Sequence, residues 1–148
     1  MCQIRSLVVS DAPTLAMLEA CERIYGCTAE EWQARLSSGH FGYIAHIGNV
    51  PAGFIAARFL EYDTRTVVHV VKLVVPSAYR RHGVALGLWL RFRNNYDSYT
   101  MLANVRESNT AARMLYEYVG FRLAGPGYPD SRYPDGENKL LMIRPSRG

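Results

Sequence analysis

An aliphatic run followed by a glycine-containing loop and a second apolar segment constrains this chain more than any other feature. Residues 67–75 are almost continuously β-branched or aliphatic, interrupted only by His69 and Lys72. Such a run is typical of a strand buried on both faces of a sheet. Pro76 ends the strand because proline cannot donate a ladder hydrogen bond. Residues 84–93 predict a helix, and a helix N-terminus after a loop is a ready anion site, since its first amides have no intrahelical partner.

The loop between this strand and helix is basic and carries small residues at two positions. From Arg80 to Ala85 it reads Arg-Arg-His-Gly-Val-Ala. At Gly83 and Ala85 the backbone can approach a phosphate closely, because no bulky side chain intervenes. The pattern favours a pyrophosphate site, and an ordinary basic loop is the alternative interpretation.

The composition is typical of a globular protein. The chain has 148 residues, of which 49% are hydrophobic and 20% charged, so we expect a single domain over residues 1–148. No apolar run reaches membrane-spanning length, and nothing resembles a signal peptide. The three cysteines are odd in number and lack metal-type spacing, which is typical of free thiols in a reducing compartment. We therefore expect a cytoplasmic protein without a metal site.

Periodicity and capping signals predict the order of elements. Strands are expected at residues 3–9, 41–47, 52–60, 66–75, 99–105, 121–124 and 139–143, and helices at 11–24, 28–37, 84–93 and 108–119. Ser10-Asp11 precedes the first helix, Thr28 and Glu31 have capping-box spacing, and Ser108 or Asn109 caps the last helix. The fold class is α/β, with a mixed sheet and helices on both faces in the order β-α-α-β-β-β-α-β-α-β-β.

A second constellation lies in residues 104–121, NVRESNTAARMLYEYVGF. On a helix, Asn109, Ala112 and Tyr116 share one face. That face combines an amide, a small residue and a phenol, which suits a narrow cofactor groove. A packed aromatic is the alternative interpretation of Tyr116.

Together, these segments resemble the GNAT superfamily of N-acetyltransferases. Residues 80–85 resemble its acetyl-coenzyme A pyrophosphate loop. Residues 104–121 resemble the helix motif of a subgroup that contains bacterial ribosomal-protein N-terminal acetyltransferases. The resemblance implies the GNAT fold with its splayed mixed sheet over essentially the whole chain. It also implies acetyl-coenzyme A as cosubstrate, no metal, and direct acetyl transfer to a primary amine without an acyl-enzyme.

The resemblance further implies roles for individual residues. Tyr116 matches the general acid that protonates the coenzyme A thiolate. The Leu73 amide would bind the thioester carbonyl, and Val75 would bind the pantetheine amides. Pro76 lies one residue earlier than the family proline, which could alter the path of the loop. The residues expected at the cofactor are Leu73, Val74, Val75, Arg80, Arg81, His82, Gly83, Val84, Ala85, Leu86, Asn109 and Ala112.

The general base is left open by the sequence. The subgroup carries glutamate where this chain has Asn104, which cannot take a proton. His69 lies four residues before Leu73, where the histone-acetyltransferase branch carries a base glutamate. A histidine of pKa near 6.5 could serve directly or through water, and a packed histidine is the alternative. A third interpretation needs no strong base, because an α-amine of pKa about 7.7–8.0 is roughly 10–20% neutral at pH 7, against well under 1% for lysine.

The acceptor is expected at the loop of residues 125–138. Its Tyr133-Pro-Asp-Gly segment resembles one in Nα-acetyltransferases whose tyrosine helps hold the peptide N-terminus, while Arg132 stands where that subgroup has a second tyrosine. The alternative interpretation is that the segment is only a turn, because Pro-Asp-Gly is a common turn sequence. Residues 24–28 would wall the other side of the acceptor groove.

We therefore predict an acetyl-coenzyme A-dependent N-acetyltransferase whose favoured acceptor is a protein N-terminal α-amine. The alternatives are a small-molecule amine acetyltransferase, acting on a polyamine or aminoglycoside, and a non-catalytic coenzyme A-binding module. We expect no nucleic-acid or membrane partner, and a homodimer remains open.

Overall fold

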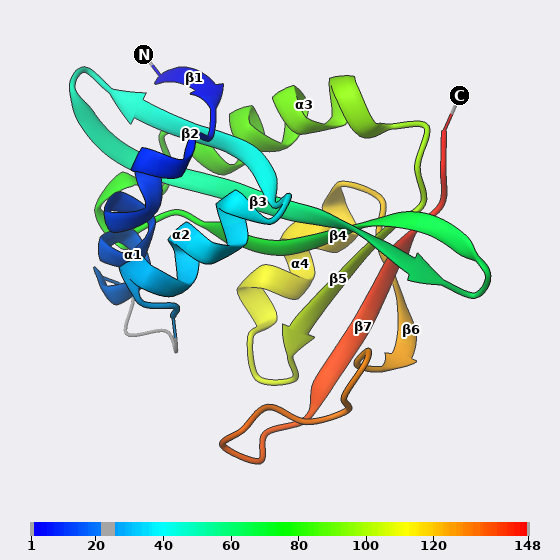
Figure 1. The fold of residues 1–148 in the computed structure, drawn as a ribbon. Helices are drawn as coiled ribbons and strands as arrows, with labels where there is room; N and C mark the ends of the chain where they lie inside the picture. Colours follow the sequence, from blue (N-terminus) through cyan, green and yellow to red (C-terminus); the bar gives the residue numbers. More distant parts are fainter. Residues whose placement is uncertain (1, 22–25, 148) are drawn as a thin grey trace. The chain divides into compact units, whose positions relative to one another are not determined.

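The computed structural model describes residues 2–21 and 26–147 (Figure 1). Within these ranges the order of strands and α-helices is the predicted one, and the α/β class with a mixed sheet is confirmed. In chain order the elements are β1 (Cys2–Ser6), η1 (Val9–Asp11), α1 (Ala12–Cys21), α2 (Ala29–Ser37), β2 (Phe41–Ile47), β3 (Val50–Tyr62), β4 (Arg65–Val74), η2 (Ser77–Tyr79), α3 (Val84–Tyr96), β5 (Met101–Arg106), α4 (Thr110–Tyr118), β6 (Arg122–Pro126) and β7 (Lys139–Arg144), where η marks a 3-10 helix.

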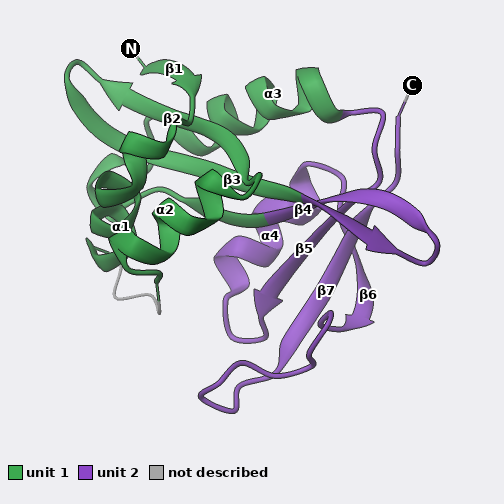
Figure 2. Ribbon diagram, in the orientation of Figure 1, with its two compact units in different colours: residues 1–58, 71–96 green, residues 59–70, 97–148 purple. Residues whose placement is uncertain are grey.

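The chain forms two compact units (Figure 2). Unit 1 comprises Met1–Arg58 and Val71–Tyr96, and unit 2 comprises Phe59–Val70 and Asp97–Gly148. The chain passes between the units within β3 and within β4, so each of these strands contributes to both. The expectation of one domain stays a prediction.

In unit 1, helices cover both faces of an antiparallel sheet. β2 pairs with β1 on one side and with β3 on the other. Because side chains alternate along a strand, Ile44 and Tyr43 point to opposite faces. Tyr43 contacts Phe92 of α3, with ring centroids 6.5 Å apart. Ile44 belongs to a buried cluster with α1 and α2 that contains Ala12, Leu15, Leu18, Trp32, Ile44, Phe54, Ala56 and Val74.

Unit 2 contains the strand order β4-β5-β7-β6. Residues 68–70 of β4 pair in parallel with residues 101–103 of β5, and β7 pairs antiparallel with both β5 and β6. Arg144 of β7 is buried, and its Nε donates to the Val119 carbonyl at 3.0 Å while its Nη1 binds Asp97 Oδ1 at 2.6 Å. The first contact ties the last strand to the end of α4, and the second ties it to the residue that follows α3.

The N-terminal boundary differs from the expectation for a physical reason. The first strand ends at Ser6, because the Asp11 carboxylate accepts a hydrogen bond from the Val8 amide at 2.8 Å and pairs with Arg5 at 2.7 Å. Although burial opposes it, the hydrogen bonds from Arg5 and Val8 hold the pKa of Asp11 below its usual value. The expected helix end at residue 24 lies outside the described residues.

The caps of α2 and α4 are formed by residues that the sequence predicts. Thr28 Oγ1 accepts from the Glu31 amide at 3.1 Å, and Glu31 Oε1 accepts from the Thr28 amide at 2.9 Å, so the capping box is confirmed. Asn109 rather than Ser108 caps α4, since its Oδ1 accepts from the Ala112 amide at 3.1 Å.

Candidate active site

The basic loop of unit 1 leads into α3 as predicted. The Gly83 carbonyl accepts the hydrogen bond of Gly87 at 2.9 Å, which makes Gly83 the residue before the first helical turn. The amides of residues 84–86 therefore lack intrahelical acceptors, as at every helix start. Arg80, Arg81, His82 and Gly83 are all exposed at this end of the helix, whereas Val84 is buried.

The backbone of this loop is strained at one residue. Gly83 adopts a φ of +72°, which glycine tolerates, but Arg81 adopts +69°. The left-handed region costs a non-glycine residue roughly 1–2 kcal/mol. Such strain concentrates at ligand-binding segments, which supports the choice of this loop as an anion site.

The end of β4 lies against a glycine that the sequence analysis did not single out. A Cβ added at Gly53 of β3 would lie 2.8 Å from the Val74 carbonyl and 3.2 Å from a methyl of Val84. Gly53 therefore permits the close packing of β3 on the segment that leads to α3. A glycine inside a strand pattern was the available signal for this close approach. Next to it, the Val75 carbonyl accepts a hydrogen bond from Arg80 Nε at 3.2 Å.

Lys72, which interrupts the apolar strand, forms an ion pair with a buried carboxylate. Its Nζ lies 3.1 Å from Glu19 Oε2, and the Glu19 side chain has no exposed surface. Glu19 Oε1 also accepts from the Cys27 amide at 3.0 Å and from Trp32 Nε1 at 2.6 Å. Glu19 was not predicted from the sequence, because a single charged residue in an apolar helix is usually exposed to solvent. The carboxylate fixes the start of α2 against α1 and β4.

Tyr116 of α4, in unit 2, is a buried phenol. Only 6% of the residue is exposed, and its ring contacts Phe121 with centroids 5.0 Å apart. Burial raises the pKa of Tyr116 well above its ordinary value of 10.0, and the neighbouring Tyr133 adds to this effect. The hydroxyl therefore stays protonated and able to donate throughout the neutral pH range.

His69 and Asn104 are brought together on adjacent strands. Asn104 Nδ2 lies 3.3 Å from His69 Nε2, and the same nitrogen donates to the Tyr128 carbonyl at 2.8 Å. Asn104 Oδ1 accepts from the Tyr128 amide at 3.0 Å. Asn104 thus holds the backbone of the loop after β6 on one side and faces a histidine ring on the other.

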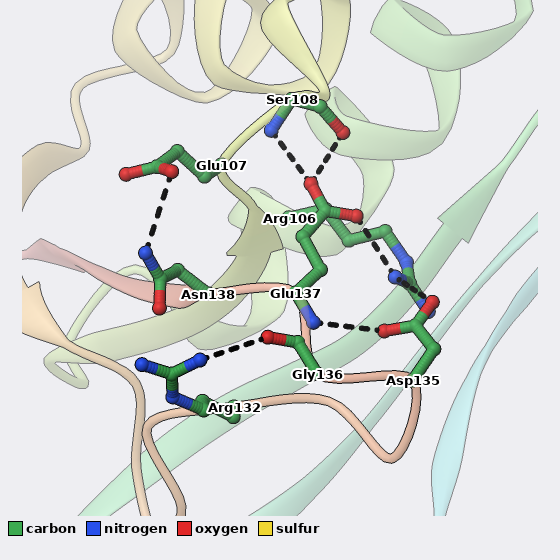
Figure 3. A network of polar contacts seen from close by, with 8 residues as sticks. All are labelled: Arg106, Glu107, Ser108, Arg132, Asp135, Gly136, Glu137 and Asn138. Carbon is green, nitrogen blue, oxygen red and sulfur yellow. Dashed lines mark hydrogen bonds and ion pairs between the residues drawn. The ribbon is translucent and has the colours of Figure 1, made fainter.

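A network of ion pairs and hydrogen bonds holds the loop that carries Tyr133 (Figure 3). Arg106 Nη1 binds Asp135 Oδ2 at 2.7 Å and Glu137 Oε1 at 2.9 Å. The second Glu137 oxygen accepts from the Ser108 amide at 2.9 Å and from the Ser108 hydroxyl. The hydrogen bonds from Ser108, and then those from Arg106, lower the pKa of Glu137 from 4.5 to about 2. Both carboxylates are therefore charged and committed to partners.

Two cations, Arg106 and Lys139, lie against the Tyr133 ring. The Arg106 guanidinium lies 4.1 Å from the centroid of the Tyr133 ring, and Lys139 Nζ lies 4.8 Å from it. The Tyr133 amide donates to the Glu137 carbonyl at 2.9 Å. Burial raises the pKa of Tyr133, even though the positive charge of Arg106 opposes the shift. The ring is therefore fixed by a preorganised loop, and its phenol remains neutral.

Within the described ranges there is neither a metal-binding group of side chains nor a helix suited to a membrane. Among residues 2–21 and 26–147, no three His, Cys, Asp or Glu side chains are grouped so that they could hold a metal ion. Within the same ranges, none of the helices has the length and apolar character needed to cross a membrane.

Comparisons with known proteins agree with this architecture. Residues 16–130 match the family profile of the acetyltransferase (GNAT) domain. An N-alpha-acetyltransferase of Saccharolobus solfataricus is 31% identical over 118 residues, which cover 70% of this chain and 68% of that protein. The chain therefore belongs to the GNAT family of acetyltransferases, and the predicted enzyme class, N-acetyltransferase, is confirmed.

Solved structures show the same fold. The ribosomal-protein-S18-alanine N-acetyltransferase from Escherichia coli is 22% identical with a TM-score of 0.83, over 100% of this chain and 96% of that chain. Arabidopsis thaliana Naa50, in complex with the bisubstrate analogue CoA-Ac-MVNAL, is 16% identical with a TM-score of 0.74, over 97% of both chains. At these identities the likeness concerns the fold, and the predicted GNAT fold is confirmed.

Proposed function

We propose that the protein transfers the acetyl group of acetyl-coenzyme A to the α-amino group of a protein N-terminus. The S. solfataricus relative is named for Nα-acetylation, and the Naa50 structure holds an analogue that joins coenzyme A to a peptide. The observation on this chain that supports the proposal concerns the loop of Tyr133, where Asp135 and Glu137 are already bound to Arg106.

A polycationic acceptor would require carboxylates that can bind several ammonium groups. Of the three acidic residues in the loop, Asp135 and Glu137 are bound to Arg106, and Glu137 is also bound to Ser108. Rebinding them to a polyamine would mean breaking charge-assisted hydrogen bonds. What the loop offers instead is a fixed aromatic ring and backbone groups. This surface suits a peptide N-terminus, which reacts in its neutral form.

Acetyl-coenzyme A is proposed to bind through backbone groups of unit 1. The amides of residues 81–86 would take the pyrophosphate, with the partial positive charge of the α3 N-terminus supporting them. The Leu73 amide would donate to the thioester carbonyl, where it would stabilise the oxyanion that develops during attack. Asn109 and Ala112 of unit 2 remain proposed contacts of the cofactor.

Tyr116 is proposed as the acid of the reaction. The amine nitrogen forms a bond to the thioester carbon, the carbon–sulfur bond breaks, and the amine proton leaves to water. The thiolate takes its proton from the Tyr116 hydroxyl, which solvent then reprotonates. Burial raises the pKa of a thiolate for the same reason as it raises that of a phenol, so a thiolate leaving in these surroundings is a matched acceptor for the Tyr116 proton.

Thiol release from acetyl-coenzyme A across an acceptor panel tests the proposal. The panel contains peptides with free or blocked N-termini, lysine peptides, polyamines and aminoglycosides. We expect release with free N-termini, and Tyr133→Ala should raise KM for the peptide without changing KM for acetyl-coenzyme A. Release with polyamines or aminoglycosides alone would assign the small-molecule alternative. Binding of acetyl-coenzyme A with no release from any amine would favour the non-catalytic module.

A further inference from the structure

We propose that Asn104 is a positioning residue that holds His69 as a neutral ring with its lone pair on Nε2 engaged, so that His69 does not act as the base. The consequence of this inference, the choice of amine, rests on the proposed function. The tautomer of His69 does not depend on it. The backbone of Tyr128 fixes which way the Asn104 amide points.

The orientation of the Asn104 side chain follows from what each backbone group can do. A backbone N–H can only donate, so the Asn104 atom 3.0 Å from the Tyr128 amide must be the oxygen. A backbone carbonyl can only accept, so the atom 2.8 Å from the Tyr128 carbonyl must be the nitrogen. A flipped amide would lose both contacts. The nitrogen that faces His69 is therefore a donor.

The tautomer of His69 follows from that orientation. Asn104 Nδ2 carries two hydrogens, of which one points to Tyr128 and the other reaches His69 Nε2 at 3.3 Å. Nε2 must present its lone pair, which leaves the ring proton on Nδ1. A second ring proton on Nε2 would place two N–H groups against each other. In this arrangement Nδ1 carries the ring proton and the Nε2 lone pair accepts the Asn104 hydrogen bond, so a substrate proton could reach Nε2 only by displacing Asn104.

The surroundings of His69 also favour the neutral ring. The residue is 8% exposed and, through strand alternation, shares a face with Val67. Val67 belongs to an apolar cluster against which Tyr62 and Tyr128 pack. Both phenols can titrate, and further along β5 Arg106 is bound to Asp135 and Glu137. These surroundings are consistent with the neutral tautomer that the Asn104 contact indicates.

The consequence is a requirement on the acceptor. Asn104 cannot take a proton and His69 is engaged, so attack depends on amine that is already neutral. At pH 7 the neutral fraction of an α-amine exceeds that of a lysine side chain on the order of 10²-fold. Asn104 thereby contributes to the selection of N-terminal over lysine amines before any binding contact is made.

Nitrogen-15 NMR of the histidine rings tests the structural claim without any acceptor. We expect the His69 signals, assigned by their loss in His69→Gln, to report a neutral ring with the proton on Nδ1 from pH 6 to 8. In Asn104→Asp the carboxylate can only accept, so the proton should move to Nε2. A wild-type ring with the proton on Nε2, or a cationic ring in this range, would overturn the inference even if the Asp variant does not fold.

A pH–rate profile tests the catalytic claim with whichever amines the panel identifies. Two acceptors whose amine pKa values, measured by titration, differ by about one unit should give kcat/KM midpoints that differ by the same amount. His69→Gln should leave both midpoints in place, as should the control His46→Gln in β2. A midpoint common to both acceptors and lost in His69→Gln would identify His69 as the base. If peptides prove inactive while the tautomer is observed, the proposed acceptor fails and the role of Asn104 stands.

Discussion

Two glutamates, one in each unit, make similar contacts in very different surroundings. Glu19 in unit 1 binds the Lys72 ammonium, the Cys27 amide and the Trp32 indole, and its side chain is fully buried. Glu137 in unit 2 binds the Arg106 guanidinium and two groups of Ser108, and 27% of its side chain is exposed. Breaking a buried ion pair is costly because a charge remains in a poorly solvated place, whereas water replaces exposed contacts readily. Glu19 is therefore expected to matter for stability and Glu137 for the position of Tyr133.

The largest effect is expected from Glu19→Ala. It removes the carboxylate beside Lys72 and leaves the Trp32 and Cys27 donors buried, so the free energy of unfolding should fall by about 3–5 kcal/mol. Urea unfolding measures this change. The matched control is Glu117→Ala on the exposed side of α4, which should change stability by about 0.5 kcal/mol or less. Equal effects of the two substitutions would contradict the distinction between buried and exposed carboxylates.

Tyr116→Phe is expected to have the second largest effect. Its effect is on kcat, whereas that of Glu19→Ala is on the free energy of unfolding. The substitution keeps the packing on Phe121 and removes the proton donor, so kcat should fall by about 10²–10⁴-fold with little change in acetyl-coenzyme A affinity. Steady-state kinetics and cofactor titration separate the two quantities. Tyr118→Phe, at a residue that is 79% exposed, is the control and should leave both unchanged. Wild-type turnover in Tyr116→Phe would remove this phenol from the acid role.

Gly53→Ala tests whether close packing in unit 1 supports the cofactor segment. The new methyl would meet the Val74 carbonyl at 2.8 Å, so stability should fall by about 1–3 kcal/mol. Because the displaced residues lead to the basic loop, KM for acetyl-coenzyme A should rise as well. Gly87→Ala in α3 meets only a side-chain carbon at 3.4 Å and should instead be neutral or stabilise by up to about 1 kcal/mol. If Gly53→Ala changed neither stability nor KM for acetyl-coenzyme A, β3 would be able to move away from Val74 without affecting either quantity.

How far the sequence predicts these sites depends on how local their contacts are. The strand, loop and start of α3 were predictable because each signal lies within a few residues, as with the Thr28 capping box. Glu19 was not, since its partners are Trp32 and Lys72 on other elements. Asn104 was noticed for the proton that it cannot take, but its actual partners lie 24 and 35 residues away along the chain. Periodicity does not report such contacts, because they exist only after the strands pair.

The smallest effect on stability is expected from Glu137→Gln, and its consequence should appear in peptide binding. Glutamine can still bond to Ser108 but attracts Arg106 less strongly, so the Tyr133 ring should lose part of its fixed position and KM for the peptide should rise severalfold with kcat little changed. Asp130→Asn, an exposed acid in the same loop, is the control.

The pH dependence of the same contact provides a second measurement. The folded-state pKa of Glu137, about 2, lies below its ordinary value of 4.5. The stabilisation of the loop by the ionised carboxylate is therefore fully present above about pH 4.5 and is lost as the pH falls toward 2. The NMR signals of the Tyr133 ring should follow this titration in the wild type and in Asp130→Asn, but not in Glu137→Gln. A Tyr133 signal that responds alike in all three proteins would mean that Glu137 does not position the ring, and that this partly exposed carboxylate, unlike Glu19, is dispensable.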